Sequence, residues 1–210
     1  MSLILVQNAA LGSENSLSSE NHILLVMDGD AKDAFPYAKL LETKLKRSKS
    51  ALKDLNKTPV TIELPHGGIA SVVVLDNSLN VFQKHTLLRK AIKPLIAEQL
   101  AICVFGSEAA RKANACAAYY VAAVNAAELP SRKKEHQHEP LKAIHIYGWQ
   151  EDHNYAFTNA RVAGNTLCRQ LTRLPPNELT PTLYREKIKT LASEYGWDWE
   201  AFDMPTLKTM

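Results

Sequence analysis

A double proline, Pro175-Pro176, divides the chain into two unequal parts. Proline has no amide donor and restricts the residue before it, so the helical pattern over residues 153–173 must end there. A second helical pattern begins directly behind it, because Thr180-Pro181 places a capping residue before a proline at the first helical position. Gly164–Pro181 therefore joins a helix that leaves one part of the chain to an element that opens another.

Before this joint, apolar strands alternate with amphipathic helices. Apolar and β-branched runs predict strands at 3–6, 22–27, 58–64, 71–75, 101–105 and 141–147. Helical periodicity predicts helices at 36–49, 82–100, 108–127 and 153–173. Pro94 interrupts the second of these helices, and the third contains ten alanines, which favours a helix buried closely against a sheet. The turn Pro65–Gly68 makes a hairpin of two of the strands, so we expect an α/β fold with a mixed, largely parallel sheet and helices on both faces.

The elements around and after the joint carry apolar faces of their own. On the helix 153–173 the predicted apolar stripe consists of Phe157, Ala160, Gly164, Leu167, Cys168 and Leu171. On the helix that starts at Pro181 it consists of Leu183, Tyr184, Ile188, Leu191 and Tyr195. Gly196 is a suitable helix stop, residues 197–202 alternate like a strand, and residues 204–210 resemble the start of a helix.

Composition excludes several classes of protein. The chain has 46% hydrophobic and 22% charged residues and a formal net charge of +3, which is typical of a globular protein and does not by itself imply a nucleic-acid partner. No apolar run approaches the ~20 residues of a membrane span. Cys103, Cys116 and Cys168 are widely spaced within apolar patterns, so we expect reduced core thiols and a cytoplasmic protein.

Several residues of the joint form a recognisable string. These residues are Arg169, Leu171, Pro175, Pro176, Asn177, Leu179, Thr180 and Pro181. The string resembles that of the leucyl aminopeptidase (cytosol aminopeptidase) family, Ala-Arg-x-Leu-x-Asn-x-Pro-Pro-Asn followed by Leu-Thr-Pro and an amphipathic helix. Arg173 stands where that family usually has asparagine, and the specific match covers roughly residues 155–210.

The resemblance implies a domain order. Residues 1–152 would form an amino-terminal α/β domain similar to the macro-domain fold, and residues 153–174 would be a linker helix. Residues 175–210 would be the truncated start of the second α/β domain, the carboxy-terminal peptidase domain. In the family, that domain binds two divalent metals, typically zinc or manganese, and the enzyme is a hexamer that removes amino-terminal residues from peptides.

The family's catalytic strings are absent from these 210 residues. Gly-Lys-Gly-x-x-x-Asp-x-Gly-Gly and Asn-Thr-Asp-Ala-Glu-Gly-Arg do not occur, and the only Gly-Gly is Gly67-Gly68. We therefore expect no catalytic, metal or cofactor-binding residue here, although the parent enzyme would be a metalloaminopeptidase. The expected partners are the peptidase domain and further copies of the chain. The alternative is a free-standing macro-type module that binds a nucleotide, similar to ADP-ribose, or nucleic acid.

Four sets of residues suggest a site, each with a simpler interpretation. Glu135-His136-Gln137-His138-Glu139 contains metal-ligand types, but a solvated charged loop explains it. A basic run suggests a phosphate-binding face or an exposed helix face: Lys44, Lys46, Arg47, Lys49, Lys53 and Lys57, with Arg132, Lys133 and Lys134. Phe105-Gly106-Ser107 suggests a phosphate site or a tight turn. His66, His85, His145 and His153 stand alone, and a lone histidine is more often a packing or surface residue than a catalytic one. Trp197 and Trp199 are expected to be half-buried strand residues that need a partner surface.

Overall fold

A computed structural model of the chain describes residues 3–29, 34–95, 97–131 and 141–210. It divides into two compact units, each described separately below. The sheet unit comprises residues 1–128 and 132–166, and the carboxy-terminal unit comprises residues 129–131 and 167–210. The helix α4 (Ala156–Thr172) begins in the first unit and ends in the second.

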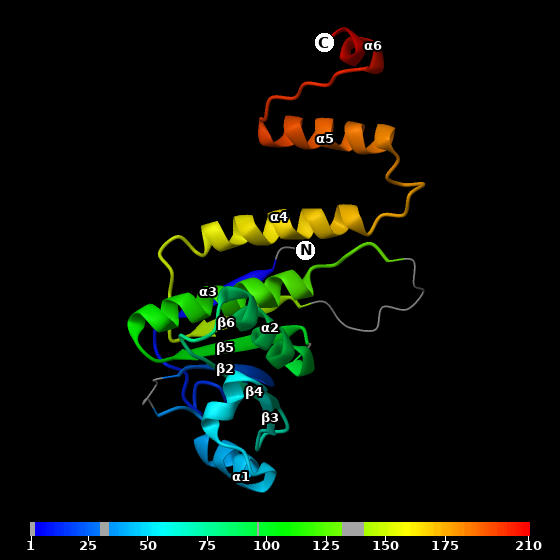
Figure 1. Ribbon diagram of the computed structural model, residues 1–210. Coiled ribbons are helices and arrows are strands. Elements are labelled where there is room, and N and C mark those ends of the chain that lie inside the picture. The colour runs from blue at the N-terminus through cyan, green and yellow to red at the C-terminus, as the bar shows by residue number, and fades with distance from the viewer. Residues whose placement is uncertain (1–2, 30–33, 96, 132–140) are drawn as a thin grey trace. The chain divides into compact units, whose positions relative to one another are not determined.

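The sheet unit contains one six-stranded sheet with the order β1-β6-β5-β2-β4-β3 (Figure 1). Five strands run parallel, and β3 pairs with β4 in the antiparallel direction. The strands are β1 (Ile4–Asn8), β2 (His22–Asp28), β3 (Val60–Glu63), β4 (Ile69–Leu75), β5 (Gln99–Phe105) and β6 (Ala143–Tyr147). The expected mixed α/β sheet and the β3–β4 hairpin are therefore confirmed.

Two hydrophobic clusters cover opposite faces of this sheet. On one face α2 (Val81–Ile92) and α3 (Glu108–Ala126) pack on alternate residues of the strands, such as Leu24 and Ile102. On the other face α1 (Ala38–Ser48) and the loop residue Leu17 pack on the intervening residues, such as Leu25. The three central strands are buried on both faces, which explains why their sequences are continuously apolar.

One predicted helix boundary is wrong. The helix expected at 82–100 ends at Ile92, a short 3-10 turn follows at Lys93–Leu95, and β5 begins at Gln99. Pro94 has no amide to continue the helix, and the apolar residues beyond it are free to join the sheet. Leu100 is thus a buried strand residue and not part of a helix face.

The stripe predicted for α4 is also wrong as a buried face. Phe157 is 78% exposed, Gly164 has no neighbour within 4 Å of an added Cβ, and Cys168 is exposed, against the expectation of a core thiol. Thr158 is the buried residue of α4, and Val162 packs against the hydrophobic cluster that contains α2 and α3. Asn159 Oδ1 also accepts a hydrogen bond from the Tyr119 hydroxyl of α3 at 2.6 Å, so the side of α4 in contact with α3 is not the predicted stripe.

The carboxy-terminal unit contains α5 (Pro181–Tyr195) and α6 (Met204–Thr209). Both α5 boundaries are confirmed. Thr180 caps the start of the helix, where its Oγ1 accepts a hydrogen bond from the Leu183 amide, and Gly196 ends it in a left-handed conformation. The strand predicted at 197–202 does not form. A strand needs a neighbour to accept its backbone hydrogen bonds, and no strand lies among the described residues of this unit.

Candidate functional site

A buried carboxylate, that of Glu20, forms a polar cluster at the amino ends of the strands. Glu20 is the second residue before β2, and its side chain is buried with only 3% of the residue exposed. β2 pairs with β5 and β5 pairs with β6, so this position lies beside Gln99, the first residue of β5, and His145 of β6. The parallel register thus assembles the cluster from three separate parts of the sequence.

Each oxygen of the Glu20 carboxylate has a partner. His145 Nδ1 lies 2.7 Å from Oε1, the Tyr147 hydroxyl donates to the same oxygen at 3.2 Å, and Gln99 Nε2 donates to Oε2 at 2.8 Å. Gln99 Nε2 also lies 3.2 Å from His145 Nδ1, but it can donate to Nδ1 only if Nδ1 carries no proton. The shorter contact, to the Glu20 carboxylate, is the stronger one, so Nδ1 carries a proton and donates a hydrogen bond to Glu20.

The backbone of Glu20 is held as well. His66 Nε2 lies 3.0 Å from the Glu20 carbonyl oxygen, and because that oxygen only accepts, Nε2 carries the proton of this imidazole. His66 and His145 were expected to stand alone, but both bind the same residue. Together they fix the loop before β2 on the sheet.

The surroundings of the cluster suppress ionisation of its neighbours. Burial and then the Glu20 charge raise the pKa of Tyr147 to about 12. Burial, with a smaller contribution from Glu20, also raises the pKa of the Cys103 thiol far above its ordinary value. A nucleophilic cysteine needs the thiolate, so Cys103 is a core residue and not a reactive group.

The cluster has part of an acid–base arrangement, but it is incomplete. A carboxylate that orients an imidazole is the usual support for a histidine base, but nucleophilic catalysis also needs a hydroxyl or thiol in contact with that histidine. Among the described residues no serine, threonine or cysteine hydrogen-bonds to His145. Nor do any three of the described His, Cys, Asp and Glu residues gather to hold a metal. The geometry supports anchoring of the loop 9–21.

At the opposite ends of the strands the turn Phe105-Gly106-Ser107 follows β5. Gly106 has φ +121°, and a Cβ there would lie 2.6 Å from Asp28 Cβ, so close packing requires glycine. Ser107 Oγ accepts from the Ala110 amide and caps α3. Packing and capping thus account for both residues, and nucleotide binding at this turn stays a prediction.

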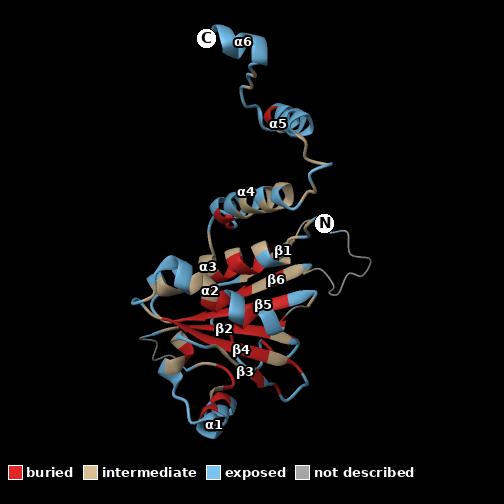
Figure 2. Cartoon of the chain, turned by 45° about the vertical axis from the view of Figure 1, so that its right-hand side comes forward, coloured by how far each residue is buried: buried red, intermediate tan, exposed pale blue. Residues whose placement is uncertain are grey.

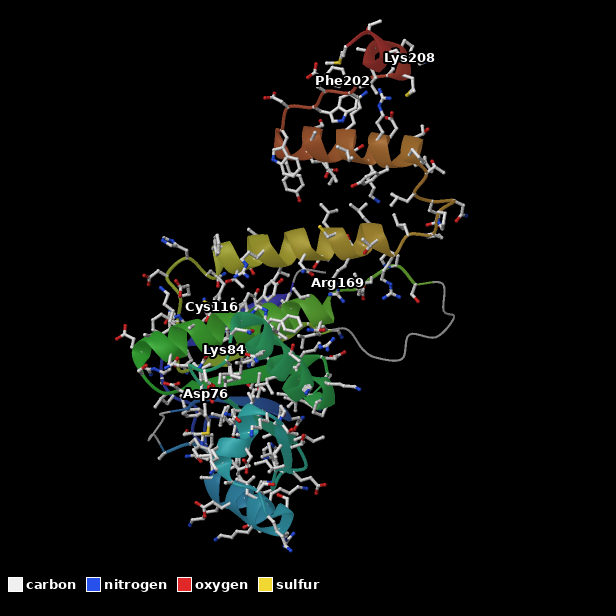
Figure 3. The ribbon with its side chains drawn as sticks, viewed as in Figure 1. Asp76, Lys84, Cys116, Arg169, Phe202 and Lys208 are labelled. Atoms are coloured by element: carbon white, nitrogen blue, oxygen red, sulfur yellow. The ribbon has the colours of Figure 1, made fainter. Side chains whose placement is uncertain are left out.

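Asp76, next to the end of β4, is a second hydrogen-bonded carboxylate (Figure 3). Asn56 Nδ2 donates to it at 2.6 Å and Ser78 donates through its amide and hydroxyl, which lowers the pKa of Asp76. Lys84 on α2 contributes a weaker electrostatic effect. The Ser78 contacts are local to the turn after β4, whereas Asn56 comes from the 3-10 turn Leu52–Asn56, and none of these contacts reaches another acidic group.

The described cations of the basic run lie on or directly beside α1 and the 3-10 turn Leu52–Asn56, and they are exposed. Lys46 and Arg47 occupy the last turn of α1, where positive charge is favourable to the helix dipole. This gives Lys46 and Arg47 a structural role, and a nucleic-acid contact stays a prediction. Residues 132–140, which contain the Glu135–Glu139 string and the remaining cations of the run, lie outside the described part of the chain.

Three of the other predicted residues, His85, Trp197 and Trp199, have packing partners. His85 lies 5.3 Å from the Tyr120 ring, and burial followed by the Arg161 charge lowers the pKa of His85. In the carboxy-terminal unit Trp197 stacks on Tyr195 at 5.0 Å. Trp199 lies beneath two cations of α5, Arg185 and Lys189. His153 is exposed.

The fold is that of the amino-terminal region of an aminopeptidase. A mutant of tomato leucine aminopeptidase superposes with a TM-score of 0.72 over 99% of this chain and 46% of its own, at 18% identity. The bottromycin maturation enzyme BotP in complex with Mn gives 0.61 over 90% and 40%, at 18% identity. Leucyl aminopeptidase from Trypanosoma cruzi gives 0.52 over 91% and 41%, at 15% identity.

These likenesses confirm, at the level of the fold, the resemblance inferred from the joint. The chain spans less than half the length of the solved structures that it matches. No protein-family model and no curated protein matches the sequence. No helix among the described residues has the length and apolar character needed to cross a bilayer.

Proposed function

We propose that this chain supplies the non-catalytic amino-terminal part of a leucine-aminopeptidase-like metallopeptidase. The observation that carries the proposal is the superposition on tomato leucine aminopeptidase, which extends over 99% of this chain but only 46% of that enzyme. The proposed division is an amino-terminal domain at 1–152, a linker helix at 153–174 and the first elements of the peptidase domain at 175–210.

The carboxy-terminal unit supports this division. Only Ala192 is buried there, while large apolar side chains are exposed along both of its helices and between them: Leu183, Tyr184, Ile188, Tyr195, Trp197, Phe202, Met204, Leu207 and Met210. Scattered exposed apolar residues are normal, but a run of this size marks a surface that another part of a protein covers. We assign the covering surface to the remainder of the peptidase domain.

The proposal places the metal chemistry outside this chain. A two-metal hydrolase needs several carboxylates and a lysine or histidine held together around bridging water. The described residues do not fit such a centre, because they contain no group of three potential ligands. In the proposed enzyme the peptidase domain would hold two zinc or manganese ions, and this part would contribute to a cytoplasmic hexamer.

The first test is an activity measurement on the purified 210-residue chain. With leucine p-nitroanilide as substrate and added manganese or zinc, we expect no hydrolysis above that of the free metal. Chelator-sensitive turnover would place a catalytic centre in this chain and overturn the proposal.

The second test is independent of activity. The transcript downstream of codon 210 is expected to encode the strings Gly-Lys-Gly-x-x-x-Asp-x-Gly-Gly and Asn-Thr-Asp-Ala-Glu-Gly-Arg in the same frame. Full-length transcripts without these strings would refute the assignment to a metallopeptidase.

A further inference from the structure

The edge strand β1 leaves one side of its backbone without a neighbouring strand. β1 lies at the end of the sheet and pairs only with β6 among the described strands. The Ile4 amide donates to the Lys142 carbonyl at 2.9 Å, so Ile4 and, two residues on, Val6 direct their backbone groups toward β6. Because the direction alternates along a strand, the amides and carbonyls of Leu3, Leu5 and Gln7 face away from the sheet.

The side chains of β1 are also exposed where those of other strands are covered. Ile4 is 59% exposed and Val6 47%, and these are the only large apolar side chains of the described strands that are exposed. Both project from the same face of the sheet. Figure 2 shows the contrast, because the central strands are buried while β1 is coloured intermediate and exposed.

The opposite edge of the sheet is protected in the ordinary ways. β3 lies between Pro59 and Pro65, ends at the exposed Glu63, and packs against α1. Prolines, charges and a covering helix are the usual devices that stop an edge strand from pairing with another chain. The sequence Ile-Leu-Val-Gln-Asn of β1 contains neither a proline nor a charge.

We propose that β1 pairs antiparallel with β1 of a second copy of this chain, about a two-fold axis at Leu5. The outward-facing residues Leu3, Leu5 and Gln7 are symmetric about Leu5, so this register uses all of their free backbone groups. Leu5 meets its own copy, and Leu3 pairs with Gln7. The sheet becomes continuous across the two copies, and the interface is isologous.

The side chains favour the same register. It places Ile4 opposite Val6 of the second copy, and Val6 opposite Ile4, so the exposed apolar side chains cover each other. No charged residue of β1 meets its own copy, which removes the repulsion that disfavours self-pairing. This proposal does not depend on the proposed function, since β1 belongs to the sheet unit and the argument uses no residue of the carboxy-terminal unit.

The primary experiment is sedimentation equilibrium of the full chain at micromolar concentrations. We expect a mass twice the 23.4 kDa of one chain. Val6→Lys should weaken the dimer about 100-fold, because a lysine at an edge strand opposes pairing. Thr61→Lys, the matched change on β3, and Trp197→Lys, in the exposed apolar surface of the carboxy-terminal unit, should leave the dimer intact.

A monomeric wild-type chain would overturn the proposal, as would a dimer that survives Val6→Lys. Loss of the dimer on Trp197→Lys but not on Val6→Lys would place the interface in the carboxy-terminal unit instead. Far-ultraviolet circular dichroism of each variant verifies that it is folded before its mass is interpreted.

A cross-linking experiment tests the register without relying on Val6→Lys. In a Cys168→Ser background, an Ile4→Cys chain is mixed with a Val6→Cys chain and mildly oxidised. The two introduced thiols face each other across the axis, within the ~5.5 Å Cα separation of a disulfide, whereas identical positions lie ~7–8 Å apart. We expect a disulfide-linked dimer in the mixture and little with either chain alone. Equal cross-linking in all three samples, or none, would contradict the register.

Discussion

The two units of this chain are built from similar sequence patterns but reach different degrees of burial. In the sheet unit, strands such as β2 and β5 are buried along nearly their whole length. In the carboxy-terminal unit one alanine, Ala192, is the only buried residue among those described. Both units have correct helix caps and amphipathic periodicity, so local signals alone do not determine whether a core forms.

The difference shows which part of folding depends on a partner surface. α5 begins and ends at residues that its own sequence specifies, Thr180 and Gly196, and α6 is capped by Asp203. Isolated helices of about this length are marginal in water unless an apolar face is covered. The sheet unit covers its own helices, whereas the carboxy-terminal unit exposes its apolar residues to a surface that we assign to the rest of a peptidase domain.

The largest expected effect contrasts one leucine from each unit. Leu24 is fully buried in β2, and Leu24→Ala should reduce the free energy of unfolding by ~2–5 kcal/mol, because it leaves a cavity. Leu183 is 49% exposed on α5, so Leu183→Ala should change the free energy of unfolding by less than ~0.5 kcal/mol. Urea denaturation followed by circular dichroism measures both.

A control for this contrast is hydrogen exchange across the whole chain. The amides of β2 should exchange only through global unfolding, while those of α5 should exchange much faster. A cost of 2 kcal/mol or more for Leu183→Ala, together with strong protection of α5, would show that the carboxy-terminal unit is covered in solution by this chain itself.

Much of the sheet unit could be predicted from its sequence, for a physical reason. A continuous apolar run such as Ala101–Phe105 favours a strand that is buried on both faces, so the strand and its burial could both be predicted. The boundary at Pro94 was missed because apolar residues on both sides of it, Ile92 and Leu95 among them, fit a helix period. Strand formation beyond the proline depends on pairing with β2, which the local sequence does not encode.

The Glu20 cluster could not be predicted. Glu20 lies in a serine- and asparagine-rich stretch that is typical of an exposed loop, and its partners Gln99 and His145 are 79 and 125 residues away. Only the order of the parallel strands brings them together. The faces of α4 were missed for the same reason, because the contact between Tyr119 and Asn159 joins two helices whose packing the helical period does not determine.

The second expected effect compares a buried glutamate with an exposed one. Glu20→Ala removes the acceptor of three side-chain hydrogen bonds and should lower the free energy of unfolding by ~2–3 kcal/mol. Glu194 is exposed on α5, and Glu194→Ala should have an effect below ~0.5 kcal/mol. Thermal denaturation of the two variants in parallel makes the comparison. Equal stabilities would show that the Glu20 cluster rehydrates without cost and does not anchor the loop.

The smallest expected effect is a loss of folding stability on acidification. A histidine can cause it only in the sheet unit, because the carboxy-terminal unit contains no histidine. Burial and Arg161 lower the pKa of His85 below its ordinary value, so the folded chain binds this proton less readily than the unfolded chain. The stability that His85 contributes is therefore present above the unfolded pKa, about 6.5, and is lost as the pH falls below it. His85→Phe keeps a ring against Tyr120, 5.3 Å away in the wild type, and should make the fall in stability between about pH 7 and pH 5 less steep.

Arg161→Gln tests the secondary cause of the same shift. This substitution removes one of the two causes of the lowered His85 pKa. The variant's loss of stability on acidification should therefore lie between those of the wild type and His85→Phe. Urea denaturation at several pH values gives the slope of the free energy of unfolding against pH for the three proteins. Identical slopes would mean that His85 titrates alike in the folded and unfolded chains. A greater acid sensitivity of hydrogen exchange in α5 than in β2 would place the acid response in the carboxy-terminal unit and reverse the comparison.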